Sequence, residues 1–92
     1  MIFEFDPSKN TLNQAKHGIS FEEAQSIWND PDLIILHGKK KGEKRFLALG
    51  EAYSVIYTVV HTKRGDVIRI ISTRKATQKE ALYYFEKRRN HD

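Results

Sequence analysis

Apolar positions follow a helical period in the first third of the chain and a strand period in the middle. A short apolar strand is expected over residues 2–5, before Asp6-Pro7 places an N-cap residue next to a proline at the first helical position. These signals predict a first helix that runs to about His17. It should end at Gly18, because glycine readily adopts the left-handed conformation that closes a helix.

A second helix is predicted to follow almost at once. Ser20 and Glu23 have the spacing of a capping box, in which each side chain bonds the backbone N–H of the other residue. Asn29-Asp30-Pro31 should end this helix, because proline disfavours helical geometry in the residue before it. Its apolar face should consist of Phe21, Ala24, Ile27 and Trp28.

Beyond Pro31 the pattern becomes strand-like, and a last helix closes the chain. A capping box from Thr77 to Glu80 predicts the start of that helix, with Ala81, Leu82 and Phe85 turned inward. We expect Arg88–Asp92 to fray as a tail. The expected strands cover residues 33–37, 44–49, 55–61 and 67–73, joined by a polar loop over 38–43 and by turns over 50–52 and 62–66.

This order of elements, β-α-α-β-β-β-β-α, indicates the fold class. The four central strands are joined by connections too short for helical crossovers, so most of their pairing should be antiparallel. Helices gathered beside such a sheet predict an α+β domain of two layers. With 92 residues, the chain is expected to form a single domain, 1–92.

Charge and composition narrow the function. The chain has 16 basic and 12 acidic residues, and residues 61–92 hold nine of the basic and four of the acidic ones. An anionic partner should therefore dock on the last third. The chain has no cysteine and its four histidines are scattered, so we expect no metal and no cofactor. No apolar run approaches the roughly 20 residues that span a bilayer, and no signal peptide is visible, which favours the cytoplasm and no membrane contact.

The main candidates for chemistry are cations of the last third. Arg69 lies inside an apolar run and must face solvent or a partner, while Arg74 and Lys75 precede a helix N-terminus, where N–H groups favour anions. Arg64 sits in a turn, and Lys79 is on the first turn of the last helix. Together these side chains suggest a phosphate-sized site, since arginine binds phosphate oxygens in pairs. The alternative is a solvated basic rim.

Two further groups allow two interpretations each. Lys16 and His17 offer a cation and a titratable imidazole, yet both also favour the C-terminal dipole of the first helix. Tyr83 and Tyr84 are adjacent on the last helix, where one should pack and the other can bring a hydroxyl to a site.

These residues also carry a family likeness. The opening Phe3-Glu4-Phe5-Asp6-Pro7, the stretch from Asn13 through Lys16-His17-Gly18 to Ala24, and the block from Val59 to Ala76 with Glu80 and Tyr84 after it resemble the BrnT-type toxins. The likeness extends in order over nearly the whole chain. Phe5 stands where tryptophan is frequent and Thr73 where alanine is usual, and neither departure removes a charged group.

The resemblance implies a toxin of a type II toxin–antitoxin system with a RelE-like fold. Such a protein is an endoribonuclease that halts translation in the cytoplasm. A cognate BrnA-like antitoxin with a ribbon-helix-helix portion would neutralise it, and promoter DNA would be bound only through the toxin–antitoxin complex.

Cleavage of RNA without a metal needs a base for the 2′-OH, cations for the charge on phosphorus and an acid for the 5′-oxygen. We expect Arg64 and Arg74 to stabilise the phosphate. The sequence does not rank His17, Lys16, Glu80 and Tyr84 as base and acid. Further RNA contacts are expected from Lys63, Arg69, Lys75 and Lys79. The alternative function is a module that binds RNA or protein without cutting, or a decayed toxin that retains only antitoxin binding.

Overall fold

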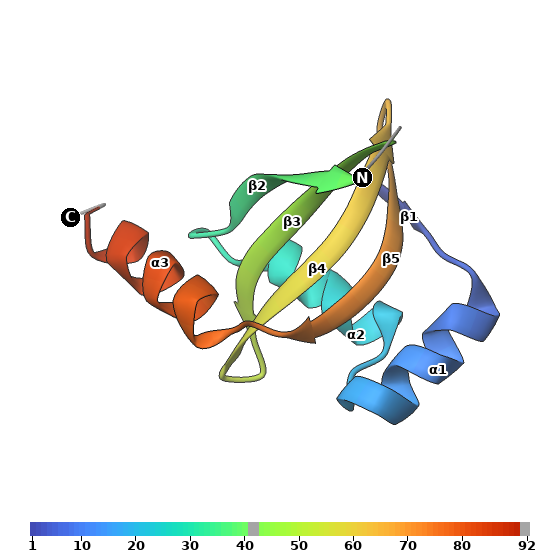
Figure 1. Cartoon of the computed structure of the whole chain (residues 1–92), viewed down its shortest axis with the longest axis horizontal. Coiled ribbons are helices and arrows are strands. Elements are labelled where there is room, and N and C mark those ends of the chain that lie inside the picture. The colour runs from blue at the N-terminus through green and yellow to red at the C-terminus, as the bar shows by residue number, and fades with distance from the viewer. Residues whose placement is uncertain (41–42, 91–92) are drawn as a thin grey trace.

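A curved five-stranded sheet forms the centre of the molecule (Figure 1). The computed structural model describes residues 1–40 and 43–90. In chain order the elements are β1 (Ile2–Glu4), α1 (Pro7–His17), α2 (Phe21–Ala24), the 3₁₀ helix η1 (Gln25–Asn29), β2 (Ile34–Lys40), β3 (Glu43–Ala52), β4 (Val55–Arg64), β5 (Val67–Lys75) and α3 (Gln78–Arg89). The strands lie in the order β1-β5-β4-β3-β2, and only the pairing of β1 with β5 is parallel. The α+β class and the mostly antiparallel sheet are confirmed.

The helix starts follow the local signals. Asp6 caps α1 by accepting a hydrogen bond from the Ser8 amide at 2.9 Å, and Gly18 closes the helix at φ +73°. Both predicted capping boxes are present, one at the start of α2 and one at the start of α3. The second helix differs from the expectation, because it becomes a 3₁₀ helix from Gln25 onward.

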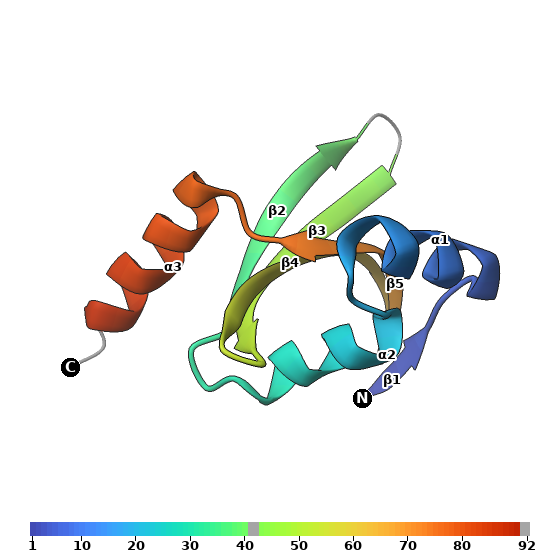
Figure 2. The ribbon, with the colours of Figure 1, turned by 90° about the horizontal axis from the view of Figure 1, so that it is seen from below.

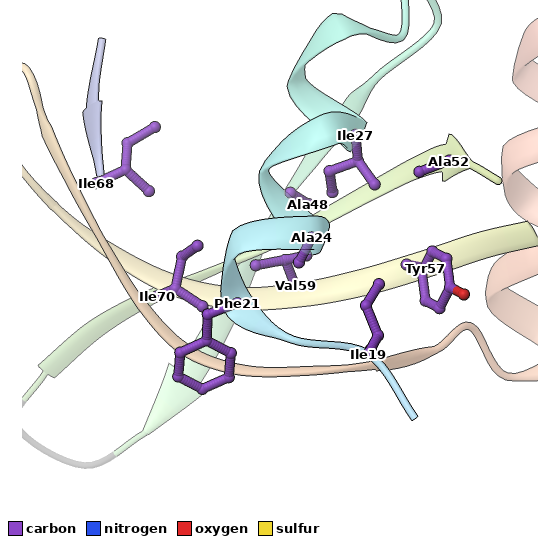
Figure 3. Packing of buried hydrophobic residues seen from close by; sticks show 10 residues of the cluster. All are labelled: Ile19, Phe21, Ala24, Ile27, Ala48, Ala52, Tyr57, Val59, Ile68 and Ile70. Atoms are coloured by element: carbon purple, nitrogen blue, oxygen red, sulfur yellow. The ribbon is translucent and has the colours of Figure 1, made fainter. Parts of the chain in front are cut away.

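The two faces of the sheet are covered differently. The sheet curls around α2 and η1, which supply Phe21, Ala24 and Ile27 to the main core (Figures 2 and 3). Gly50 permits this close approach, since a Cβ there would lie 2.8 Å from the Cβ of Ile27. On the other face, α3 covers a smaller core around Leu49, Ile56 and Tyr84. Helices therefore lie on both faces of the sheet, and the prediction of two layers is wrong.

The turns differ from the sequence expectation. β3 continues through residues 50–52, and the chain reverses at Tyr53 and Ser54, which have φ of 52° and 63°. Positive φ is uncommon for residues other than glycine, so local propensity pointed to Gly50 instead. The next turn is also tighter than 62–66, because β4 extends to Arg64. The 38–43 loop is shorter too, and its residues Lys41 and Gly42 lie outside the described part of the chain.

A β-bulge sets which side chains of β5 share a face. Val60 pairs with Ser72 and His61 pairs with Ile70, so Ile71 is an extra residue on β5. Residues five apart in a regular strand point to opposite faces. The bulge reverses this alternation and places Arg69 and Arg74 on the same face, the one that α3 partly covers.

Helix α3 turns an unexpected face toward the sheet. The inward residues were predicted to be Ala81, Leu82 and Phe85, but Leu82 is 62% and Phe85 45% exposed, while Tyr84 is fully buried. The prediction of Leu82 and Phe85 as core residues is therefore wrong. The stripe that faces the body is Glu80, Tyr84 and Arg88, spaced four residues apart.

The end of the chain also differs from the expectation. Fraying was expected from Arg88 onward, whereas α3 is helical to Arg89. The Arg88 side chain forms ion pairs with Asp32 and Glu51, both at 3.4 Å, and these pairs hold the last turn against the body.

Candidate functional site

The best-organised polar site in the described residues joins β5 to the first turn of α3. Arg74 and Glu80 form a two-pronged ion pair, with Nη1–Oε1 at 2.6 Å and Nη2–Oε2 at 3.0 Å. Glu80 Oε1 also accepts hydrogen bonds from the Thr58 hydroxyl at 2.9 Å and from the Thr77 amide at 2.8 Å. Thr58 lies opposite Arg74 on β4, so the sheet register and the helix cap together fix the carboxylate.

This network fixes the charge of Glu80. The hydrogen bond from Arg74 is the largest cause that lowers the pKa of Glu80, to about 2, and it outweighs the effect of burial. The same bond raises the pKa of Arg74 above its ordinary value. Glu80 is therefore a carboxylate at neutral pH and holds no proton to donate, which removes it as a general acid.

One edge of the Arg74 guanidinium remains open. Glu80 occupies one N–H on each Nη atom, and the second Nη1 hydrogen points toward the Lys75 carbonyl at 3.4 Å. Arginine has five N–H donors, so Nε–H and one Nη2–H are left without a partner among the described residues. These two donors lie side by side and match two oxygens of a phosphate.

A second group of cations lies at the far end of the same strands. Lys63 and Arg64 end β4 and are exposed, and Arg64 has no ion pair within the described residues. Arg69 pairs with Glu4 at 3.3 Å and is 43% exposed. The register places Arg64 and Arg69 on the face that Arg74 also uses, and Lys63 on the opposite face.

The two groups are too far apart to hold one phosphate. Arg74 lies opposite Thr58, six residues before Arg64 on β4. At about 3.3 Å per residue, the two arginines are separated by roughly 20 Å along the strand. The single phosphate-sized cavity that the sequence suggested is therefore not formed. The cations instead form two groups along one face of the sheet, Arg64 with Arg69 and, farther along, Arg74; we call this line of three arginines the cationic path.

Lys16 and His17 end α1, and Lys16 is exposed while His17 is half-buried. Asn13 joins α1 to β5. Its side-chain NH₂ donates to the Thr73 hydroxyl at 2.6 Å, and its side-chain oxygen accepts from the Thr73 amide at 3.1 Å. His17 lies one helical turn beyond Asn13 on the same stripe, and Thr73 is the residue before Arg74. The fold thus places α1 beside the Arg74 end of β5, with Thr73 itself pointing to the face of the sheet opposite Arg74.

The surroundings of Tyr84 indicate a structural role. Its side chain is fully buried, and its hydroxyl donates a hydrogen bond to Asp30 Oδ2 at 2.5 Å. Burial and this bond raise the pKa of Tyr84 above its ordinary value. Burial acts to raise the pKa of Asp30 as well, but hydrogen bonds from Tyr84, Glu51 and Asp32 outweigh it, and the pKa is lowered. Tyr84 therefore fastens α3 to the segment before β2.

The remaining cations flank the Arg74 site. Lys75 ends β5 and Lys79 lies on the first turn of α3, and both are exposed. By strand alternation Lys75 points to the face opposite Arg74, where its partner Tyr57 belongs to the main core, whereas Lys79 lies in the same helical turn as Glu80.

Sequence reasoning missed three residues that organise this site. Thr58 bonds Glu80, Asn13 bonds the edge of β5, and Ile71 forms the bulge that aligns the arginines. The consecutive apolar pair Ile70-Ile71 indicates a break in strand alternation, but the pair Val67-Ile68 in the same strand has the same pattern and no bulge. Thr58 and Asn13 carry no signal without the tertiary arrangement.

The described residues contain neither a cluster suited to a metal ion nor a helix that could cross a membrane. Their histidines and carboxylates form no group of three suited to holding a metal ion. None of their helices has the length and apolar character to cross a bilayer.

A comparison with known protein families identifies the family of this chain. A family model described as the ribonuclease toxin, BrnT, of type II toxin–antitoxin systems matches residues 5–80 of the chain. The matched range contains α1, α2, η1, the four strands β2 to β5 and the Arg74–Glu80 pair, and β1 lies before it. No curated protein matches the chain.

Proposed function

The chain belongs to the BrnT family of ribonuclease toxins from type II toxin–antitoxin systems, and from this we propose that it is a metal-independent endoribonuclease whose reaction centre is the open edge of Arg74. The observation that carries the proposal is the partly exposed guanidinium that Glu80 holds from one side, leaving two N–H donors without a partner among the described residues. A cation fixed before substrate arrives stabilises charge on phosphorus without reorganising during the reaction.

We assign Glu80 a positioning role. Its carboxylate orients Arg74 and is itself oriented by Thr58 and Thr77. Tyr84 is buried on Asp30, which leaves His17 and Lys16 as the candidates that can exchange a proton with RNA. Of these we propose His17 as the base that takes the 2′-OH proton, because a ring nitrogen of histidine can accept a proton. Lys16 then contributes positive charge beside it.

The rest of the cationic path would guide the RNA strand. Lys75 follows Arg74 in β5 and Lys79 lies on the first turn of α3, while Arg69 and Arg64 lie roughly 13 Å and 20 Å from Arg74 along its face. In this proposal Arg64 binds a phosphate several nucleotides from the scissile bond. It therefore acts in binding rather than at the reacting phosphate.

The family also suggests the cellular setting. We propose a RelE-like fold, inhibition of translation in the cytoplasm, and neutralisation by a BrnA-like ribbon-helix-helix antitoxin that binds promoter DNA together with the toxin. Occlusion of the Arg74 end by acidic antitoxin residues would silence the enzyme, since charge complementarity favours that surface. Expression of the chain alone should arrest bacterial growth, and co-expression of the antitoxin should restore it. Normal growth at high levels of folded protein would contradict this setting.

The direct test is single-turnover cleavage of single-stranded RNA with EDTA present. Arg74→Ala should lower the rate by about 100- to 1000-fold, as removal of a fixed charge-stabilising donor does. Arg74→Lys should recover part of the rate, because an ammonium cannot present two parallel donors. Lys9→Ala, an exposed change on α1, serves as the control and should cut like the wild type.

The same assay separates the alternative, a binding module that does not cut. The two-pronged ion pair between Arg74 and Glu80 is compatible with such a module, because it also joins β5 to α3 structurally. RNA binding without cleavage in the wild type would favour the module. Cleavage at the wild-type rate by folded Arg74→Ala would show that the reaction centre is misplaced.

A further inference from the structure

A pocket of about 710 Å³ opens on the face of the sheet opposite Arg74. It lies where β1, η1, β3, β4 and the β4–β5 turn meet, beyond the end of the main core. Its size is within the range of pockets that hold small molecules and single nucleotides. The proposed ribonuclease mechanism uses none of its lining residues as a reacting group.

Aromatic rings form a large part of the pocket wall. Trp28, Phe46 and His61 all line it, and His61 connects the other two. The His61 ring is 5.2 Å from Trp28 in an edge-to-face arrangement and 5.6 Å from Phe46 in a stacked one. His61 is only 3% exposed, and burial lowers its pKa, so the ring is neutral at pH 7. His61 therefore packs behind Trp28 and Phe46, and these two partly exposed rings give the wall an uncharged aromatic surface that suits a planar ligand.

The rim of the pocket carries charge and adjoins the cationic path. Lys63 lines the pocket, and the next residue, Arg64, points to the opposite face. Asp66, in the turn that follows, also lines it and offers a carboxylate acceptor. A polyanion that follows the arginines along one face can thus pass around this turn with its phosphates near Arg64 and Lys63.

We propose that this pocket binds one unstacked base of single-stranded RNA, at a distance of several nucleotides from the Arg74 centre. This inference rests on RNA being the substrate, as proposed above. Single-stranded RNA is commonly recognised by bases that are splayed out and stacked on aromatic side chains. An aliphatic protein side chain would fill the same space, but it would make no use of Lys63, of the adjacent Arg64 or of the flat rings.

Trp28 provides a direct readout, because it is the only tryptophan of the chain. The probe is a single-stranded 2′-O-methyl RNA hexanucleotide, which cannot be cut by attack of the 2′-oxygen. The matched control is an abasic strand of the same length and charge. We expect the base-containing strand to change Trp28 emission in a saturable way, and the abasic strand to leave it unchanged.

Two variants test the pocket itself. Phe46→Leu keeps an apolar side chain but removes a stacking face, and should weaken binding of the hexanucleotide on the order of tenfold. Lys63→Gln should weaken it less and reduce its salt dependence by about one counterion. Lys9→Gln, on the exposed surface of α1, should behave like the wild type. If Phe46→Leu does not fold, Lys63→Gln and the comparison of the two strands still decide the question.

Each opposing outcome overturns the proposal. Equal responses to the two strands would show that only charge is sensed, and no response to either would show that the pocket takes no base. A change of emission on dilution of the protein alone, with self-association in sedimentation, would show that a second copy of the chain fills it. Cleavage of unmodified RNA without a Trp28 response would support the proposed ribonuclease activity and refute the base pocket. A Trp28 response without cleavage of unmodified RNA would support the base pocket and contradict the ribonuclease.

Discussion

Replacing Glu80 with glutamine tests whether the α3 network is ionic. The pKa of Glu80 falls from 4.5 to about 2 in the folded protein. A shift of roughly 2.5 units at about 1.36 kcal/mol per unit gives an upper bound of ~3 kcal/mol. The Glu80 side chain is 17% exposed, so we expect Glu80→Gln to lower the free energy of unfolding by about 2–3 kcal/mol at pH 7.

The pH dependence gives this prediction its sign. A carboxyl group whose pKa is depressed by folding contributes its full stability above its unfolded pKa, here 4.5, and loses that stability as the pH falls through the folded value. The difference between the wild type and Glu80→Gln should therefore be constant above about pH 5.5. It should shrink steadily between pH 4.5 and about 2.

Urea unfolding followed by circular dichroism at a series of pH values measures this difference. Other carboxyl groups titrate in both proteins and cancel in the subtraction. Glu86→Gln, on an exposed position of the same helix, should differ from the wild type by at most about 0.5 kcal/mol at any pH. A destabilisation by Glu80→Gln that is equally large at pH 3 and pH 7 would refute the ionic account, because it would show that shape rather than charge is lost.

Three other changes test separate parts of the molecule. Tyr84→Phe should cost about 1.5–3 kcal/mol in urea unfolding, since it removes a hydrogen bond to the charged Asp30, and no loss would mean that this bond does not hold α3. Gly50→Ala should cost about 1–3 kcal/mol in thermal unfolding, because the new Cβ would meet Ile27 at 2.8 Å; a neutral effect would show that η1 can shift. Arg64→Ala should reduce the salt slope of RNA binding by about one and leave the saturated cleavage rate unchanged, whereas a large loss of rate would place Arg64 at the reacting phosphate.

Local signals were sufficient for the helix starts and insufficient for the orientation of α3. Asp6, Ser20 and Thr77 cap their helices as predicted, because a cap depends on residues within one turn. The inward face of α3 was misjudged because apolar residues were counted toward the core. The stripe that contacts the body begins and ends with the charged residues Glu80 and Arg88, whose partners on other elements are invisible in the sequence.

The candidate site, too, could be predicted from the sequence only in part. Arg74 and Glu80 were both named from the sequence, but their pairing depends on Thr58, which joins them only through the register of β4 and β5. The grouping of Arg64 with Arg74 failed for a related reason. Their ten-residue separation spans a hairpin, and the length of the two strands, rather than the separation along the chain, sets the distance between them.

The contact between Asn13 and Thr73 has a consequence for how this protein behaves in concentrated solution. β1 pairs only with residues 67–69 of β5, so the outer edge of β5 would otherwise expose backbone groups near Thr73. The Asn13 side chain occupies that edge by accepting from the Thr73 amide, as the backbone of a neighbouring strand would. Exposed strand edges are templates for pairing between molecules. A helix side chain that imitates a peptide group thus occupies this part of the β5 edge, and a strand of another chain could pair there only by displacing it.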